Sequence, residues 1–330
     1  RKRRRGQSVT VEPVADACKL PPLPDRSSGD GAGVLFAATY DNAATIGKTL
    51  GRLKKFADTI PLLFNKQGLE ISFLEKSRVS QPSIRVPVSA FARFDNLVQR
   101  KIAVNVPAQT LQKFAVMCTA NHSLTFLYDQ NGDTSTKLEL MLYPRDLDLR
   151  SEQKVRLSVP SLNGELTVLE PHNNYQCAVT LSPQNFALNM KRMEAESTTV
   201  RLAPSERGLD MAAVSDTGHE TLVLETMRVG SAEEMSTKTC MIEKLDVESS
   251  VTLQDLGNFR LSSVYLSSIA AFSEVPECTE LVLRFGVAKH ADGSHAEQPL
   301  HLQFRVRPNA HIGAFDIDCW LATRVNDDGK

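Results

Sequence analysis

The sequence repeats one local order of elements, and this repeat limits the folds that the chain can adopt. Residues 101–128 read as a strand, a helix that starts at a proline, and a second strand. Residues 175–202 show the same order, with the helix starting at Ser182 and Pro183. Proline suits the first turn of a helix because no helical hydrogen bond uses its missing N–H there. Such self-similarity predicts a chain built from two related halves.

Four helices are predicted from apolar side chains that recur at helical spacing, over residues 43–56, 107–118, 183–194 and 262–272. Each is expected to face a core with one apolar stripe: Ile46, Leu50, Leu53 and Ala57; Leu111, Phe114 and Cys118; Phe186, Met190 and Met193; and Tyr265, Ile269 and Phe272. Short alternating runs between the helices predict antiparallel strands with one buried face. The predicted fold class is α+β, with two similar domains that each carry two helices on antiparallel sheets.

The length of 330 residues favours two domains over one. Residues 1–33 are rich in Pro, Gly, Ser and charge, so they are predicted to be disordered. We expect an N-terminal domain at 34–158, an interdomain connector at 159–174 and a C-terminal domain at 175–326. The basic cluster at 1–5 leaves three interpretations open: a nuclear-import signal, an arm that binds polyanions, and a solvated tail without a function.

Basic side chains lie opposite the apolar stripes on three of the predicted helices. Because like charges at helical spacing repel each other slightly, a polyanion is one explanation for them, and exposure to bulk water is the other. The net charge of −1 does not by itself indicate a nucleic-acid binder, so any such surface requires segregated charge. The candidates are Lys48, Arg52, Lys54, Lys55, Lys113, Lys191 and Arg192.

Several functional classes lack support. The six cysteines are scattered without the spacing of a metal site, which favours buried thiols in a reducing compartment. No apolar run reaches the length of a membrane helix, and none follows the basic start as in a secretory signal. A cysteine nucleophile with a histidine base is the enzymatic alternative, but glycine-rich phosphate loops and hydrolase motifs are absent. We therefore expect no metal, no cofactor, no membrane and no catalysis.

Several stretches resemble one known family in the same order along the chain. They include FAATYDNAATIGKTLGRLKKF and YQCAVTLSPQNFALNMKRM, and together they lie at 36–56, 66–80, 175–193, 264–286 and 299–325. They are similar to the DNA sliding clamps of the proliferating cell nuclear antigen type. The resemblance covers about residues 34–325 and rests on several weak matches rather than on one sharp motif.

This resemblance implies a ring, usually of three subunits, that encircles double-stranded DNA and tethers a DNA polymerase. The helices would line the hole, so the seven basic candidates would contact DNA without reading its sequence. The strands near 154–159 and 220–227 would pair between neighbouring subunits. A homotrimer is the first expectation, and a clamp loader is a further candidate partner. The expected location is the nucleus, or a viral replication site in an infected cell.

The family also docks short partner peptides in a pocket beneath the connector. By matching positions, the wall of this pocket would consist of Leu74, Val168, Leu169, Pro171, Pro299, Trp320, Leu321 and Ala322. A groove of apolar side chains suits an aromatic anchor. The alternative is that Leu74, Leu169, Pro299 and Leu321 are ordinary core residues.

The sequence departs from the family pattern at several points. The fourth helix is nearly uncharged where family members carry Lys or Arg, Arg78 stands where a histidine is common, and Thr323 replaces an expected proline. These departures suit a divergent clamp, from a large DNA virus or a distant eukaryote. They also suit one subunit of a heterotrimeric checkpoint clamp. The near-neutral net charge leaves a further alternative, a β-rich adaptor that does not bind DNA.

Overall fold

The computed structural model describes residues 34–96, 101–129, 137–145, 155–160, 175–205, 208–215, 220–224, 242–248, 252–253, 256, 258–289, 295–308 and 313–323. The predicted tail at 1–33 and most of the predicted connector, 161–174, lie outside these ranges. The division of the chain into domains therefore stays a prediction.

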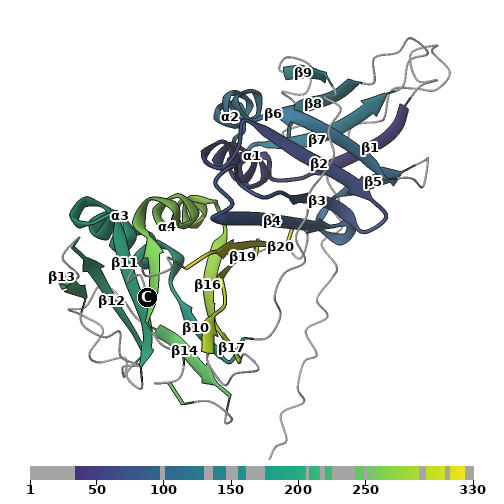
Figure 1. The fold of residues 1–330 in the computed structure, drawn as a ribbon. Helices are drawn as coiled ribbons and strands as arrows, with labels where there is room; N and C mark the ends of the chain where they lie inside the picture. Colours follow the sequence, from purple (N-terminus) through teal and green to yellow (C-terminus); the bar gives the residue numbers. More distant parts are fainter. Residues whose placement is uncertain are drawn as a thin grey trace, which may run out of the picture.

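A strand–helix–strand unit forms four times in the described chain, twice as often as the repeat read from the sequence (Figure 1). The units are β1 (Val34–Tyr40), α1 (Ala43–Arg52) and β2 (Thr59–Asn65); β6 (Ile102–Pro107), α2 (Ala108–Met117) and β7 (His122–Asp129); β10 (Cys177–Leu181), α3 (Pro183–Glu196) and β11 (Thr199–Ser205); and β15 (Phe259–Ser262), α4 (Ser263–Ala270) and β16 (Cys278–Phe285). The 3-10 turns η2 (Leu53–Lys55) and η5 (Ala271–Glu274) extend α1 and α4.

The remaining strands complete four antiparallel sheets. They are β3 (Gly68–Ser72), β4 (Ser80–Pro87), β5 (Arg93–Asn96), β8 (Lys137–Pro144), β9 (Val155–Pro160), β12 (Gly208–Val214), β13 (Glu220–Leu224), β14 (Ile242–Val247), β17 (Val287–Lys289), β18 (His295–Glu297), β19 (Leu300–Val306) and β20 (Phe315–Leu321), with a 3-10 turn η3 (Val88–Ala90) after β4. The sheet orders are β5-β1-β7-β8-β9, β14-β10-β16-β19-β20-β4-β3-β2-β6, β13-β12-β11-β15 and β17-β18.

Every one of the four units links the nine-stranded sheet to a smaller sheet. The helices α1 and α2 join it to the five-stranded sheet, and α3 and α4 join it to the four-stranded sheet. The repeated unit is therefore a helix that connects two sheets, because each helix is flanked by one strand of the nine-stranded sheet and one strand of a smaller sheet. The predicted α+β fold with two similar helix-bearing halves is confirmed.

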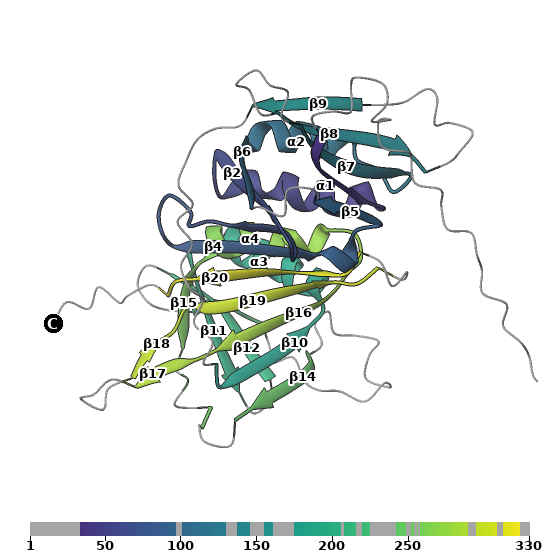
Figure 2. The same ribbon diagram turned by 90° about the vertical axis from the view of Figure 1, so that its right-hand side faces the viewer.

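The nine-stranded sheet runs through both halves of the chain. Strand β20, near the end of the sequence, pairs with β4 near its start, with Asp316 opposite Arg85 and Leu321 opposite Ser80. Figure 2 shows these two strands side by side at the junction. The ladder makes the two halves one continuous framework.

The predicted apolar stripes bury as expected. Ile46, Leu50, Leu111, Phe186, Met190 and Ile269 are each at most 1% exposed, and all belong to one core cluster. Tyr265 differs, because it is only partly buried and its hydroxyl bonds Ser77 Oγ at 2.7 Å on the turn between β3 and β4. Its ring packs on the core while its polar end reaches the other half of the chain.

Helices α1 and α2 approach each other unusually closely. A Cβ added to Gly47 would lie 2.5 Å from Cys118 Cβ, and one added to Gly51 would lie 2.7 Å from Ala115 Cβ. Asn42 begins α1, with its side-chain oxygen accepting from the Ala44 N–H at 3.1 Å. Gly47 and Gly51, one turn apart, therefore allow the backbones of α1 and α2 to approach each other closely.

Candidate nucleic-acid interface and partner pocket

The helices lie along the same side of the molecule, and their charge is distributed unequally (Figure 1). The first pair, α1 with η2 and α2, carries five basic and no acidic residues. The second pair, α3 and α4 with η5, carries two basic and three acidic residues. The positive potential of this helix layer is therefore concentrated on the N-terminal half.

All seven sequence candidates lie in this layer, on α1, η2, α2 and α3. Among the described residues, no ion pair involves Lys48, Lys54, Lys55, Lys113 or Arg192, and their side chains are exposed. These five cations are available for a polyanion from solution. The other two, Arg52 and Lys191, share one carboxylate.

Glu274 is that carboxylate, and it connects the two helix pairs. One of its oxygens accepts from Arg52 Nη2, and the other accepts from Lys191 Nζ at 3.0 Å. Burial raises the pKa of Glu274, but the hydrogen bond from Lys191 and the charges of Arg52, Lys191 and Lys55 outweigh it, so the pKa is lowered. The carboxylate is therefore ionised at neutral pH.

A second carboxylate fixes the same joint at the other end of α1. Glu277 accepts from Thr45 Oγ1 at 3.0 Å and from Asn42 Nδ2 at 3.2 Å, next to the positive end of the helix dipole. Glu277 has a φ of 66°, a backbone conformation that is costly for a non-glycine residue. Nearby, the rings of Phe56 and Phe272 stack at 5.8 Å across the joint.

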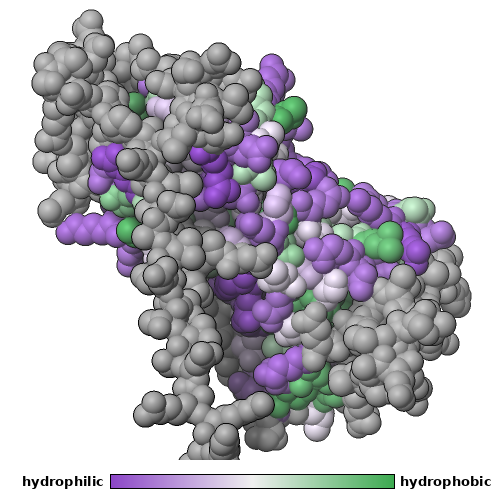
Figure 3. All heavy atoms as spheres, turned by 180° about the vertical axis from the view of Figure 1, so that it is seen from behind, coloured by the Kyte–Doolittle hydropathy of each residue, from purple (hydrophilic) through white to green (hydrophobic). Residues whose placement is uncertain are grey.

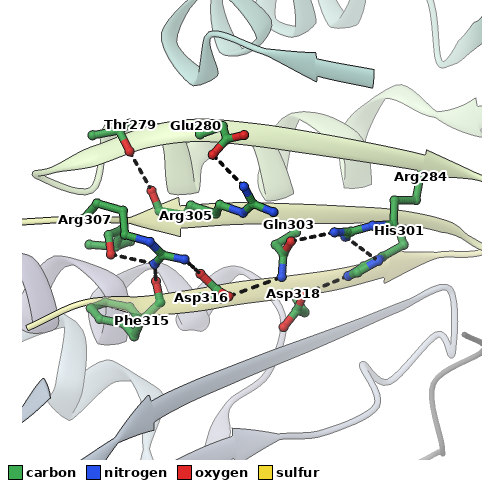
Figure 4. A network of polar contacts seen from close by, with 11 residues as sticks. Thr279, Glu280, Arg284, His301, Gln303, Arg305, Arg307, Phe315, Asp316 and Asp318 are labelled. Carbon is green, nitrogen blue, oxygen red and sulfur yellow. Dashed lines mark hydrogen bonds and ion pairs between the residues drawn. The ribbon is translucent and has the colours of Figure 1, made fainter. Parts of the chain in front are cut away.

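The opposite face of the nine-stranded sheet carries a polar network (Figure 4). His301 Nε2 lies 2.8 Å from Asp318 Oδ1, while Arg284 Nη1 lies 3.2 Å from His301 Nδ1. The arginine can only donate, so these contacts favour a neutral imidazole that carries its proton on Nε2. Gln303 accepts a hydrogen bond from Arg284 and donates one to Asp316. At the other end of the network, Arg307 Nη2 donates to Asp316 Oδ1 at 2.6 Å.

Three rings meet at one end of this network. The indole of Trp320 stacks on the imidazole of His301, with centroids 4.8 Å apart and an interplanar angle of 3°. The ring of Tyr175 also packs against His301, with ring centroids 5.5 Å apart. Burial raises the pKa of Tyr175 to about 12, so its hydroxyl keeps its proton. The stack gives Trp320 a fixed, partly exposed position.

The structure brings several predicted pocket residues to one end of neighbouring strands. Leu300 and Ser80 both lie opposite Leu321 in the sheet, which places Pro299, Ala322 and the turn that holds Leu74 near one another. Leu74, Pro299, Trp320 and Ala322 are all partly buried.

Leu321 is different, because its side chain is 0% exposed and belongs to the core cluster. The alternative interpretation as a core residue therefore describes Leu321 better than a place in the pocket wall. Alternation along β20 explains the split, since neighbouring side chains point to opposite faces of a sheet. Val168, Leu169 and Pro171 lie outside the described residues.

Two strands end their sheets at opposite ends of the molecule (Figure 1). β9 is the last strand of the five-stranded sheet, and β13 is the last strand of the four-stranded sheet. They overlap the segments predicted to pair between subunits, 154–159 and 220–227. A terminal strand leaves one row of backbone groups available for pairing with another chain.

Other chemistry finds little support in the described part of the chain. Its four free cysteines are buried, and burial raises the pKa of Cys118, Cys177 and Cys278 to about 12, so these thiols stay protonated and poorly nucleophilic. No cluster of three metal-ligating side chains was found among the described residues. Within the same residues, no helix combines the length and apolarity required to cross a membrane. From behind, hydrophilic residues dominate the coloured surface, with small hydrophobic spots between them (Figure 3).

Comparisons with known proteins agree with this geometry. The family model described as "Proliferating cell nuclear antigen, N-terminal domain" matches residues 35–165. Proliferating cell nuclear antigen 2 of Drosophila melanogaster is 20% identical over 294 residues, which cover 89% of this chain and 99% of the relative. DNA polymerase sliding clamp 3 of Sulfurisphaera tokodaii is 25% identical over 181 residues, or 55% of this chain and 69% of that protein.

Solved structures show the same fold. The crystal structure of the proliferating cellular nuclear antigen of Entamoeba histolytica superposes with a TM-score of 0.66 at 15% identity, covering 88% of this chain and all (100%) of the other. This chain has the PCNA fold, and its residues 35–165 match the N-terminal domain of that family. The PCNA2–PCNA3 complex of Sulfolobus tokodaii gives a TM-score of 0.64 at 17% identity, covering 87% of this chain and 99% of that chain.

Within this PCNA-like fold, sequence reasoning found the cations but missed the groups that organise them. Glu274 and Glu277 were not predicted as site residues, because nothing in the local sequence indicates that they have partners on α1. The contacts among Tyr175, His301 and Trp320 were also missed, since Tyr175 precedes β10 while His301 lies on β19 and Trp320 on β20. One usable signal was present: Gly47 and Gly51 at i and i+4 indicate close helix packing.

Proposed function

We propose that this chain is a subunit of a ring-shaped sliding clamp that encircles duplex DNA and tethers DNA polymerase and other partner proteins. The observation that carries the proposal is the helix layer, whose N-terminal half presents five basic and no acidic residues. The names of the relatives point the same way. The role is that of a scaffold, so no catalytic residue is assigned.

The chemistry of these cations suits contact with a moving polyanion. Lysine and arginine side chains neutralise phosphates whatever the base sequence, and this contact weakens as salt rises. Contacts to phosphate position a protein without reading bases. Long side chains on rigid helices follow the backbone of the duplex while the ring moves along it.

Closure of the ring is proposed to use β9 and β13 as complementary edges of neighbouring subunits. Such head-to-tail pairing is a heterologous contact, and it closes into a ring when the rotation between subunits divides a full turn. The proposed domains are those expected from the sequence, at 34–158 and 175–326. The position of the two edges at opposite ends of the subunit supports this arrangement.

Partner peptides are proposed to dock where Leu74, Pro299, Trp320 and Ala322 meet, with the connector residues Val168, Leu169 and Pro171 completing the pocket. An aromatic anchor in an apolar, rigid pocket is a common hot spot of recognition. The nucleus is the proposed location, and a clamp loader is a proposed partner, because a closed ring needs help to enclose DNA.

The proposal is tested by reversing three charges on the first helix. The variant Lys48→Glu, Arg52→Glu, Lys55→Glu is expected to lose retention on closed circular DNA while keeping its solution mass, because phosphates would then meet six fewer units of positive charge per chain. Retention is measured by gel filtration of the protein with circular and with linearised plasmid.

The matched control reverses Lys66, Arg85 and Lys101 to Glu, an equal charge change at exposed positions outside the helices. This control should keep most of its retention. Equal retention by both variants would contradict a DNA path along the helix layer, and equal loss would indicate an effect of net charge alone.

One observation favours a second candidate, a subunit of a heteromeric ring. The second helix pair carries more acidic than basic residues, so a homomeric hole would have alternating charge. A solved complex of two different PCNA chains from Sulfolobus tokodaii has the same fold. Different partner chains would supply the missing positive charge.

A further inference from the structure

Glu274 lies where the two helix pairs of the subunit meet. Its two oxygens are divided between Arg52 of the first pair and Lys191 of the second. The side chains of Arg52, Lys191 and Glu274 are 32%, 63% and 40% exposed, so all three can be reached from solution. The carboxylate thus forms ion pairs with two of the seven cations that are proposed to contact DNA.

The backbone holds Glu274 in this position. It ends η5, where Phe272 is 0% exposed and Ser273 is 3% exposed. Ser273 Oγ donates to the Ala270 carbonyl at 2.5 Å, which ties the turn to the end of α4. Glu274 therefore follows two buried residues of a tied turn, which places its carboxylate beside Arg52 and Lys191.

A phosphate and this carboxylate need the same donors. Both are oxygen anions that accept charge-assisted hydrogen bonds from guanidinium and ammonium groups. A DNA phosphate that approaches Arg52 or Lys191 must therefore displace Glu274 or lie beside it, and repulsion between like charges opposes the second arrangement.

We propose that Glu274 is an internal counter-ion that competes with DNA phosphates for Arg52 and Lys191 and so weakens the hold of the ring on DNA. The inference rests on the proposed function. A clamp must stay on DNA without stopping at any position. An intramolecular competitor weakens the contact of each cation with a DNA phosphate but leaves the cation in place. Glu274 acts as a positioning residue that sets how tightly the helix layer binds.

The test compares Glu274→Gln with Glu196→Gln in the full chain. Both changes remove one negative charge from the helix layer, but Glu196 is exposed on α3 and makes no ion pair with another described residue. Binding of a fluorescent linear duplex is measured by anisotropy at several salt concentrations, and circular dichroism verifies the fold of each variant.

Glu274→Gln is expected to bind the duplex about fivefold more tightly than Glu196→Gln, the factor that corresponds to release of one exposed ion pair. Its dependence of log affinity on log salt should steepen by about 1–2, since Arg52 and Lys191 become available to phosphates. In an Arg52→Gln background, the gain from Glu274→Gln should shrink.

Equal affinities and equal salt slopes for the two variants would overturn the inference, since charge alone would then explain any gain. Weaker binding by Glu274→Gln would overturn it as well, because Glu274 would then organise the cations for DNA. Absence of duplex binding by the unmodified protein and both variants would instead overturn the proposed function, an outcome distinct from the other two.

Discussion

Trp320 shows how a single position acquires its properties from the sheet. It is the chain's one tryptophan, and it lies between Cys319 and Leu321, whose side chains are both 0% exposed. Because side chains alternate along a strand, burial of these neighbours directs Trp320 to the other face. There His301, held by Asp318 and Arg284, provides the flat surface on which the indole stacks.

We predict that a peptide with an aromatic anchor will change the fluorescence of Trp320 when it binds. The variant Trp320→Ala should weaken this peptide at least about tenfold, as truncation of a hot spot does. Affinity of the variant is measured by calorimetry, because the fluorophore is lost. Val247→Ala, an exposed apolar residue on β14, serves as the control and should leave the affinity unchanged. Unaltered peptide affinity in Trp320→Ala would place the docking site elsewhere.

At the scale of elements, the pair α1 and α2 depends on two positions that lack a side chain. Glycine inside a helix is ordinarily unfavourable by about 1 kcal/mol relative to alanine. Gly47 and Gly51 are retained in α1, where the space for a Cβ is already occupied by Cys118 and Ala115. The close approach they allow sets the spacing of the basic side chains on both helices.

We predict that Gly51→Ala lowers the free energy of unfolding by about 1–2 kcal/mol, against its helix propensity, because the new Cβ would overlap Ala115 Cβ. Adding Ala115→Gly should relieve the overlap, so the two changes should show a favourable coupling of about 1–2 kcal/mol. Urea unfolding of the two single variants and the double variant measures this cycle. Strictly additive effects would show that the helices separate easily and that the contact does not limit their packing.

At the scale of the whole molecule, one sheet holds both halves while two smaller sheets end in terminal strands. The pairing of β20 with β4, the contacts of Glu274 and Glu277, and the stacking of Phe56 on Phe272 all cross the joint within a subunit. Among the described strands, β9 and β13 each pair with one neighbour only. A ring of these subunits would therefore open between subunits rather than within one.

We predict a solution mass near three times the 36.4 kDa of one chain, the mass of the homotrimer that the family resemblance implies, in which every β9 and β13 edge would be paired. Light scattering on a size-exclusion column, at several protein concentrations, measures it. A mass that falls on dilution would indicate a weak seam. A monomer at every concentration would contradict the homotrimer and favour a ring with different partner chains.

The helices and their buried faces were predictable because their information is local. The spacing of Ile46, Leu50 and Leu53 is enough to define one apolar stripe, and a polar residue before the first turn is enough to begin a helix. The basic residues opposite that stripe follow from the same periodicity. Of the candidate sites, the sequence thus determined the cationic face of α1.

Only the tertiary structure decided which of those cations are available. Arg52 and Glu274 are far apart in the sequence, and no local pattern relates them; they meet because β20 pairs with β4 and brings η5 against α1. The burial of Leu321 and the exposure of Trp320 depend on the same ladder. Periodicity records how a residue faces its own helix or strand, whereas contacts between distant segments depend on how the sheets join.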